Sequence, residues 1–323
     1  MSDPRLNLKG KNVKLTKEQK AINRKRNFKN IRKDLWLYIL LIPGILHFIV
    51  FKYAPMWGIS IAFQDYNPYT GFLNSPWVGL KHFKDFFTSP YFIRLFKNTL
   101  LLSFYNIVFS FPAPIILALL LNELRVRWYK RGIQTLIYIP HFISWVIVAS
   151  LTFTLFNSTG VINGIIHAIT GETIPFLTSV DTFRAMIIGQ GMWKEMGWGT
   201  IIFLAAMSGV DVQLYEAAIV DGAGRFRQLW HITLPAIRST IVILLILRMG
   251  KVLDNGFDQI FLMSNSLNRS VSEVFDTYVY IMGITRGAFS YSTAVGLFKS
   301  LIGIILILSA NKLAKKFGES GIF

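Results

Sequence analysis

Polar and ionisable side chains occur inside the most apolar stretches of this sequence, where a transport pathway or a buried reaction centre would need them. One group lies in the stretch over residues 183–207 and consists of Gln190, Lys194 and Glu195. A second group, with intervals of three, four and three residues, consists of Arg248, Lys251, Asn255 and Asp258. This spacing predicts that the second group forms one helical face. We predict that both groups line a polar pathway, with that face as its principal lining.

The two cations of the second group need an anion near them. Arg248 and Lys251 lie one helical turn apart, and two cations at membrane depth repel each other. Asp254 and Asp258 would supply the anion if the same helix continues through them. A carboxylate on a transported solute would do so as well, and at this stage both explanations stay open.

Lys194 and Glu195 in the first group are neighbours in the sequence. Successive residues of a helix point about 100° apart, so we expect each side chain to have a different partner. Both need one, because an unpaired charge at membrane depth is costly.

Catalytic chemistry has little support among these side chains. His141 and Ser144 lie on one turn, but no acid accompanies them to orient an imidazole base, which disfavours an intramembrane enzyme. The sequence has no cysteine, and its five histidines lack the paired spacing of metal ligands. We expect no catalytic residue, no metal and no cofactor in this chain.

The apolar stretches indicate a membrane protein. The 323 residues are 53% hydrophobic and 16% charged, and the mean hydropathy is +0.46. A helix that crosses a bilayer needs about 20 mainly apolar residues. Six such stretches lie near residues 35–51, 98–121, 133–156, 183–207, 237–253 and 291–310. The expected fold is an all-α membrane protein with six transmembrane helices.

Lysine and arginine, which give the chain its net charge of +17, are unevenly distributed around these stretches. Twelve of them precede Leu35, and further groups follow the second, fourth and sixth stretches. Short cytoplasmic segments keep an excess of such residues, so both termini are predicted to be cytoplasmic. The expected parts are a basic N-terminal segment over 1–34, which favours attraction to anionic lipids, a transmembrane domain over 35–310 and a basic tail over 311–323.

The segment between the fourth and fifth stretches, Glu216 to Pro235, would then face the cytoplasm. Its first residues favour a helical turn, and the run Asp221–Gly224 permits a sharp break because glycine takes a positive φ at little cost. A second short helix should follow, with Pro235 in the first turn of the fifth stretch. No strand precedes the glycines and no GKS or GKT follows them, which excludes a phosphate-binding loop. We predict a site where another protein docks.

This segment resembles the EAA loop of the permeases of ABC importers. The resemblance rests on nine positions at fixed spacing, namely Glu216, Ala217, Ala218, Asp221, Gly222, Ala223, Ile232, Leu234 and Pro235. It implies the type I ABC importer permease fold and a coupling loop over 213–235 that sits in a cleft of a cytoplasmic ATPase subunit. The ATPase-coupling residues that it implies are Glu216, Ala217, Ala218, Asp221, Gly222, Ala223 and Pro235.

Shorter matches extend the resemblance to the carbohydrate-uptake permeases, and to the subgroup that imports fragments of complex polysaccharides. They lie at Val78–Phe83, Asn98–Leu100, Pro112–Pro114, Leu121–Glu123 and Ile139–Phe142. His82 stands where that family usually has asparagine, which puts only a loop contact in doubt. At Pro140–His141 we expect a kink with a hydrogen-bonded histidine in preference to a ligand-binding one.

The resemblance implies a permease subunit of an ATP-driven importer in the bacterial plasma (inner) membrane. It would move an oligosaccharide, such as an acidic fragment of alginate or pectin, into the cytoplasm by alternating access. The implied partners are a second homologous permease in a heterodimer, an ABC ATPase dimer that binds ATP and magnesium, an extracytoplasmic solute-binding protein and membrane lipid, with no nucleic acid. The alternatives are a permease of the same fold for another polar solute, such as a peptide or a lipoprotein-linked substrate, and a non-transporting membrane scaffold.

Overall fold

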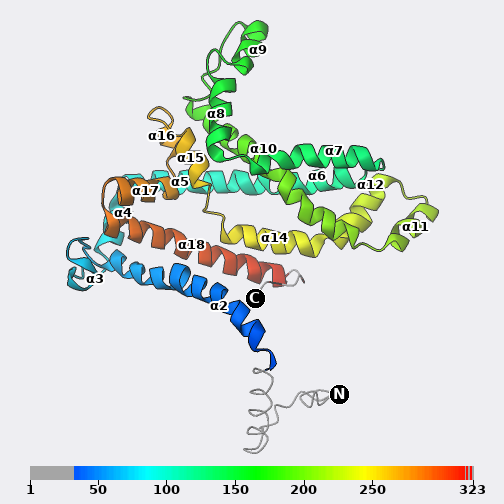
Figure 1. Cartoon of the computed structure of the whole chain (residues 1–323). Coiled ribbons are helices and arrows are strands. Elements are labelled where there is room, and N and C mark those ends of the chain that lie inside the picture. The colour runs from blue at the N-terminus through cyan, green and yellow to red at the C-terminus, as the bar shows by residue number, and fades with distance from the viewer. Residues whose placement is uncertain (1–32, 317, 319–320, 322–323) are drawn as a thin grey trace, which may run out of the picture. The chain divides into compact units, whose positions relative to one another are not determined.

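The computed structural model describes residues 33–316, 318 and 321, and within them the chain is helical with no strand (Figure 1). One isolated antiparallel bridge joins Gln64 and Trp77. The chain divides into two compact units, residues 1–60 and residues 61–323. Most of the predicted basic N-terminal segment over 1–34 lies outside the described residues, as does the end of the basic tail over 311–323.

The described part of the first unit is one long apolar helix. It comprises α2 (Leu35–Phe48), the π-helical turn Ile49–Tyr53 and most of the 3-10 helix Ala54–Phe63. No residue of α2 is buried. The helical run Leu35–Phe63 is 29 residues long, which is enough to cross a bilayer and longer than the predicted stretch over 35–51.

The second unit begins with two short helices, α3 (Gly71–Asn74) and α4 (Lys81–Thr88). A long helical run follows, made of α5 (Tyr91–Tyr105), the π-helical turn Asn106–Ser110 and α6 (Pro112–Asn122). Pro112 and Pro114 lie in the first turn of α6, directly after the π-helical turn, and the helical run continues through them. The prolines therefore leave this 32-residue candidate span intact.

The third apolar stretch is not the continuous helix that the sequence predicted over 133–156. Helix α7 (Arg127–Tyr138) ends at a 3-10 turn over Ile139–Phe142, and the chain turns again before α8 (Trp145–Phe156). Pro140 has no N–H to donate, and the Ser144 side chain caps α8 by accepting from the Ile147 N–H at 3.4 Å. The candidate span here is instead Trp145–Thr170, which includes α9 (Val161–Thr170).

The fourth and fifth candidate spans are bent. Helix α10 (Val180–Ser208) meets α11 (Val212–Val220) at an angle of 72°. The run Arg225–Ala236, which contains α12 (Arg225–Gln228) and α13 (Leu234–Ala236), meets α14 (Arg238–Gly250) at 59°. Four unbent helices are long and apolar enough to cross a membrane, and the number reaches six if each bent pair counts as one span.

The remaining helices follow an interruption after α14. Residues 251–256 are not helical, and Gly256 has a φ of +81°. Helix α15 (Phe257–Met263) starts next, followed by α16 (Arg269–Ser272), α17 (Phe275–Tyr280) with the π-helical turn Ile281–Thr285, and α18 (Phe289–Lys316). The prediction that Arg248, Lys251, Asn255 and Asp258 share one helical face is therefore wrong.

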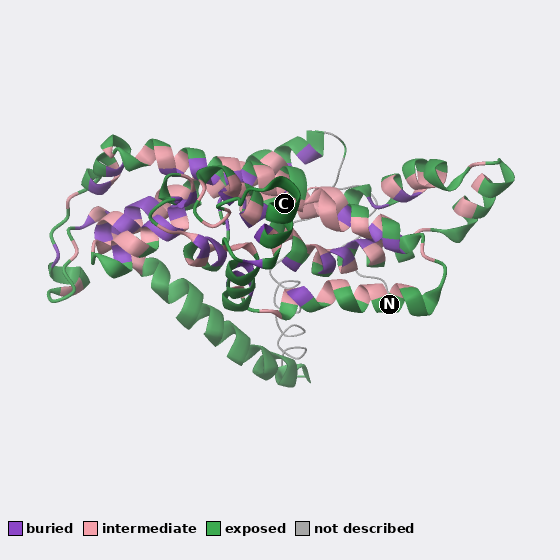
Figure 2. Cartoon of the chain, turned by 90° about the horizontal axis from the view of Figure 1, so that it is seen from above, coloured by how far each residue is buried: buried purple, intermediate pink, exposed green. Residues whose placement is uncertain are grey.

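Buried apolar side chains of the second unit form three clusters, and Figure 2 shows buried positions spread over several helices. One close approach lies between α10 and the end of α7. A Cβ atom on Gly197 would lie 1.9 Å from the carbonyl oxygen of Ile137, so only glycine fits there. This contact brings the 3-10 turn at Ile139–Phe142 against α10, which matters for the polar site described next.

Candidate coupling loop and transport pathway

The predicted coupling loop is a hairpin of two short helical segments. Helix α11 is capped by Asp211, whose carboxylate accepts from the Gln213 N–H at 2.9 Å. It ends at Asp221, and the chain reverses at Gly222, which has a φ of +73°. As predicted, glycine allows this break, because a left-handed backbone is unfavourable for residues with a Cβ atom.

Side-chain contacts hold the hairpin closed. The Tyr215 and Thr233 hydroxyl oxygens lie 2.9 Å apart, and the Gln228 amide donates to the Ala223 carbonyl at 2.8 Å. The first contact joins α11 to the π-helical turn Leu229–Thr233, and the second joins α12 to the reversal that precedes it. Pro235 lies in α13, not in the first turn of α14 as predicted, because the helix bends at Ile237.

The hairpin exposes large apolar side chains that nothing in the described chain covers. Val220 is 87% exposed and Phe226 is 78% exposed, and Glu216, Asp221 and Gly222 are also exposed. No atom outside the immediate backbone lies within 4 Å of a Cβ built on Gly222. An exposed apolar surface with a small residue at its tip is suited to contact with another protein.

The first predicted pathway group contains a compact charged cluster. Lys194 is 6% exposed, and its Nζ donates to the His141 carbonyl and lies 3.6 Å from Glu195 Oε1. Glu195 Oε2 lies 2.8 Å from Nδ1 of the same histidine. The expectation that Lys194 and Glu195 have different partners is wrong, because the turn packed against α10 offers both of them the same residue. His141 is hydrogen-bonded, as expected.

Aromatic rings surround this cluster, and they were not predicted from the sequence. The His141 ring stacks on Trp198 with 4.5 Å between centroids and an interplanar angle of 3°. The Lys194 ammonium lies 5.5 Å from the centroid of the Trp145 ring. Trp198 is 45% exposed, beside the exposed carboxylate of Glu195. Trp198 lies one helical turn beyond Lys194, and this spacing could have predicted that it lies beside the cluster.

The Gln190 side-chain amide is hydrogen-bonded to other side chains of the protein. Its Nε2 donates to the Thr152 hydroxyl at 2.7 Å, and its Oε1 accepts from Gln259 at 3.0 Å. These bonds link α10 to α8 and α15. Gln190 therefore contributes to helix packing at this position.

The second predicted group separates into exposed and buried members. Arg248, Lys251 and Asp258 are exposed, and within the described residues none of these side chains has a hydrogen bond or an ion pair. Glu195 lies close enough to Arg248 for their charges to attract. Asn255 is buried, and its amide donates to the Thr99 carbonyl at 3.2 Å. The structure therefore brings Arg248 near the Lys194–Glu195 cluster. Asn255 instead joins the non-helical segment 251–256 to α5.

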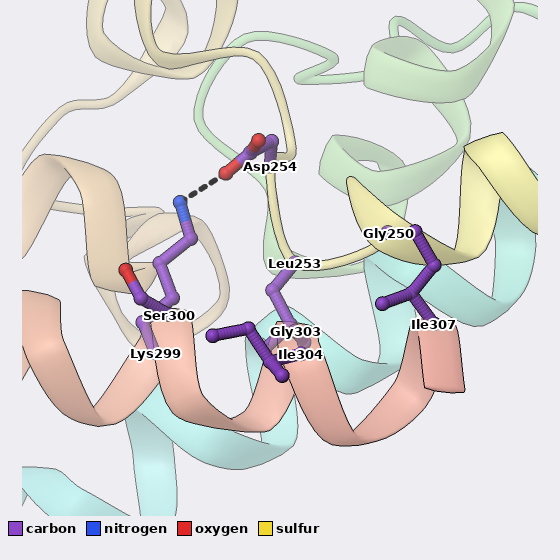
Figure 3. A pocket seen from close by; sticks show the side chains of 8 residues that line it. All are labelled: Gly250, Leu253, Asp254, Lys299, Ser300, Gly303, Ile304 and Ile307. Carbon is purple, nitrogen blue, oxygen red and sulfur yellow. Dashed lines mark hydrogen bonds and ion pairs between the residues drawn. The ribbon is translucent and has the colours of Figure 1, made fainter. Parts of the chain in front are cut away.

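One explanation for the paired cations was that Asp254 neutralises Lys251, and the structure does not show this pair. Asp254 pairs with Lys299 of α18, which also pairs with Asp276 of α17. Figure 3 shows Lys299 directed toward Asp254 in a pocket of about 340 Å³ lined by both residues. Lys299 was not predicted as a functional residue from the sequence. Its signal was a lone charge within the sixth apolar stretch.

These features define a helical membrane protein with polar side chains inside apolar helices and an exposed helical hairpin, as a transport component requires. The chain belongs to the family of binding-protein-dependent transport system inner membrane components, whose family model matches residues 110–319. The predicted family and the all-helical membrane fold are thereby confirmed.

Known relatives cover nearly the whole chain. Protein LplB of Bacillus subtilis (strain 168) is 64% identical over 294 residues, which are 91% of this chain and 92% of that protein. The polygalacturonan/rhamnogalacturonan transport system permease protein YteP of the same strain is 56% identical, over 94% of this chain and 95% of that protein.

Two solved structures share the fold. One is a crystal structure of a bacterial ABC transporter involved in the import of the acidic polysaccharide alginate, with 39% identity and a TM-score of 0.84 over 90% of this chain and 99% of that chain. The other is a bacterial alginate ABC transporter in complex with its alginate pentasaccharide-bound periplasmic protein, with 38% identity and a TM-score of 0.85 over 92% of this chain and 100% of that chain.

Proposed function

We propose that this chain is a permease subunit of an ATP-driven importer that carries oligosaccharides, and acidic ones in particular, into the cytoplasm by alternating access. The observation that carries the proposal is the Lys194–Glu195–His141 cluster beside the exposed ring of Trp198. Sugars present hydroxyl groups to charged side chains and apolar ring faces to aromatic ones. A partly exposed cluster with both features, inside an apolar helix, suits a saccharide in transit.

The acidic character of the substrate is supported by charge. Arg248 and Lys251 have no ion-pair partner within the described residues, and Asp254 is engaged by Lys299. An exposed cation at membrane depth attracts an anion from the pathway. Two relatives are named for polygalacturonan/rhamnogalacturonan transport and for alginate import, and both names denote acidic polymers.

The proposed arrangement has six spans with both termini in the cytoplasm. The two bent helix pairs would be the fourth and fifth spans, with the α11–α12 hairpin between them on the cytoplasmic side. Glu216, Ala217, Ala218, Asp221, Gly222, Ala223 and Pro235 would then contact an ATPase dimer, which binds ATP and magnesium. A second homologous permease and an extracytoplasmic solute-binding protein would complete the importer.

Uptake by intact cells tests this proposal. Cells that lack this chain, and the same cells with it restored, would be given labelled uronate and neutral oligosaccharides of equal length. We expect the restored chain to increase uronate uptake strongly and neutral uptake weakly. Uptake of neutral oligomers alone would contradict the acidic substrate, and restoration of neither, with the chain present in the membrane, would favour another solute or a scaffold.

A further inference from the structure

Two arginines pair with one carboxylate away from the Lys194–Glu195 cluster, and a third arginine is joined to the same place through Asn98. Arg184 lies in the second turn of α10, Arg94 in α5 and Arg269 at the start of α16. Helix α16 contacts both α5 and α10 (Figure 1). The carboxylate belongs to Glu273, which is 3% exposed. None of these residues was among the predicted pathway residues.

Both carboxylate oxygens of Glu273 are paired with arginines. Arg94 pairs with one oxygen of Glu273. Arg269 donates to the other oxygen through Nη2 at 2.9 Å and Nε at 3.2 Å. Arg184 instead donates to the neutral amide oxygen of Asn98 at 3.1 Å, and the Asn98 amide donates to the Glu273 carbonyl at 3.1 Å. Arg184 is therefore fixed beside the other two without a negative partner.

The arginine cluster has more positive charge and more donors than its surroundings satisfy. Asp181, one turn before Arg184, forms no ion pair within the described chain. Burial raises the pKa of the Tyr278 hydroxyl, so this neighbour of Glu273 contributes no negative charge. The Nε atoms of Arg94 and Arg184 are buried without a hydrogen-bond partner in the described residues, so a ligand would reach these side chains through their Nη groups. Partly buried cations of like sign are stabilised by an additional anion.

We propose that Arg184, Arg94 and Arg269 form an outer binding site for the carboxylate groups of an acidic saccharide, used before the saccharide reaches Lys194 and Glu195. The proposal rests on the proposed function. Guanidinium groups suit this ligand because their paired N–H groups match the geometry of a carboxylate.

The position of the cluster favours a saccharide over an acidic loop of a partner protein. Arg184 and Glu195 are eleven residues apart, so they lie on the same side of α10 and about 16 Å apart along it. A saccharide of several units can extend from one site toward the other. In the proposed orientation, Arg184 is at the extracytoplasmic end of α10 and is reached first.

The test uses the assembled importer in vesicles, with the solute-binding protein in excess. The probes are a labelled oligogalacturonate and its full methyl ester, which has the same backbone without the charge. Arg184→Gln should raise the apparent KM for the acid about tenfold, because the variant loses a charge-assisted hydrogen bond to the carboxylate. The KM for the ester should stay unchanged, and Arg184→Lys, which keeps the charge without the paired N–H groups, should raise the KM for the acid less than Arg184→Gln does.

Controls separate this site from a structural role. Arg286→Gln removes an exposed cation that has no side-chain partner in the described chain, and it should change neither KM. An equal rise for acid and ester in Arg184→Gln, no rise for the acid, or weaker docking of the empty binding protein would each overturn the proposal. Arg269→Gln provides a second variant if Arg184→Gln fails to assemble. If the parent importer carries neither probe, the proposed function itself has failed.

Discussion

Arg248 has an exposed guanidinium near Glu195 and no ion pair in the part of the chain that the structure describes. If it neutralises a passing carboxylate, Arg248→Gln should lower the uptake of acidic oligosaccharides by about tenfold or more, the effect of losing a charged hydrogen bond. Basal ATPase activity of the complex should stay near that of the parent.

The control for Arg248 is Lys312→Gln, which removes an exposed cation near the end of α18. It should transport as the parent does. If Arg248→Gln carries the acidic oligosaccharide at the parental rate, this arginine does not contact the substrate.

Asn255 differs from its neighbours because its amide is buried against the Thr99 carbonyl. Asn255→Leu should lower the free energy of unfolding by about 0.5–1.5 kcal/mol, since it removes this buried hydrogen bond while the Ser103 hydroxyl still donates to the same carbonyl. Thermal unfolding of the purified chain in detergent measures the loss. Asp258→Asn, which changes an exposed and unpaired side chain, should shift stability by less than about 0.5 kcal/mol. If the Asn255→Leu variant is as stable as the parent but no longer transports, Asn255 lines the transport pathway after all.

In the α11–α12 hairpin, glycine variants separate the effect of backbone conformation from the effect of added side-chain volume. Gly222→Ala forces a Cβ into a left-handed backbone and should cost about 1–2 kcal/mol locally. Gly224→Ala places the same methyl group where φ is −65° and no atom lies near, so it should be almost neutral.

The larger variant Gly222→Trp fills the proposed docking surface. It should leave the chain inserted in the membrane and prevent its co-purification with the ATPase subunits. An intact complex with normal ATP-driven uptake would show that the tip of the hairpin does not contact the ATPase. Loss of the chain from the membrane would show that Gly222 serves folding.

The hairpin could be predicted from the sequence because its signals are local. A helix-favouring run, a glycine at the reversal and a second short helix lie within twenty residues. The face over residues 248–258 could not be predicted, because its interruption depends on Asn255 reaching α5, about 150 residues earlier in the chain. The cluster around His141 likewise depends on the close approach of Gly197 to Ile137.

At the scale of the whole molecule, six spans remain a proposal that rests on two bent helix pairs. The absence of native cysteine gives a clean background for labelling. A cysteine in place of Leu267, which is exposed between α15 and α16, should react with an impermeant reagent added outside intact cells. A cysteine in place of Phe226 in the hairpin should react only after the cells are opened. Labelling of Phe226→Cys in intact cells would contradict the proposed topology.

Import of acidic oligosaccharides is measured directly as ATP-dependent uptake of a labelled oligogalacturonate by vesicles. The vesicles contain the purified complex of this chain with its permease, ATPase and binding-protein partners. We expect accumulation that requires ATP on the side of the membrane that the ATPases face. It should exceed that of a neutral oligosaccharide of equal length and should be lost with Gly222→Trp. Accumulation of only the neutral oligosaccharide, or no ATP-dependent accumulation of either by a fully assembled complex, would contradict this expectation.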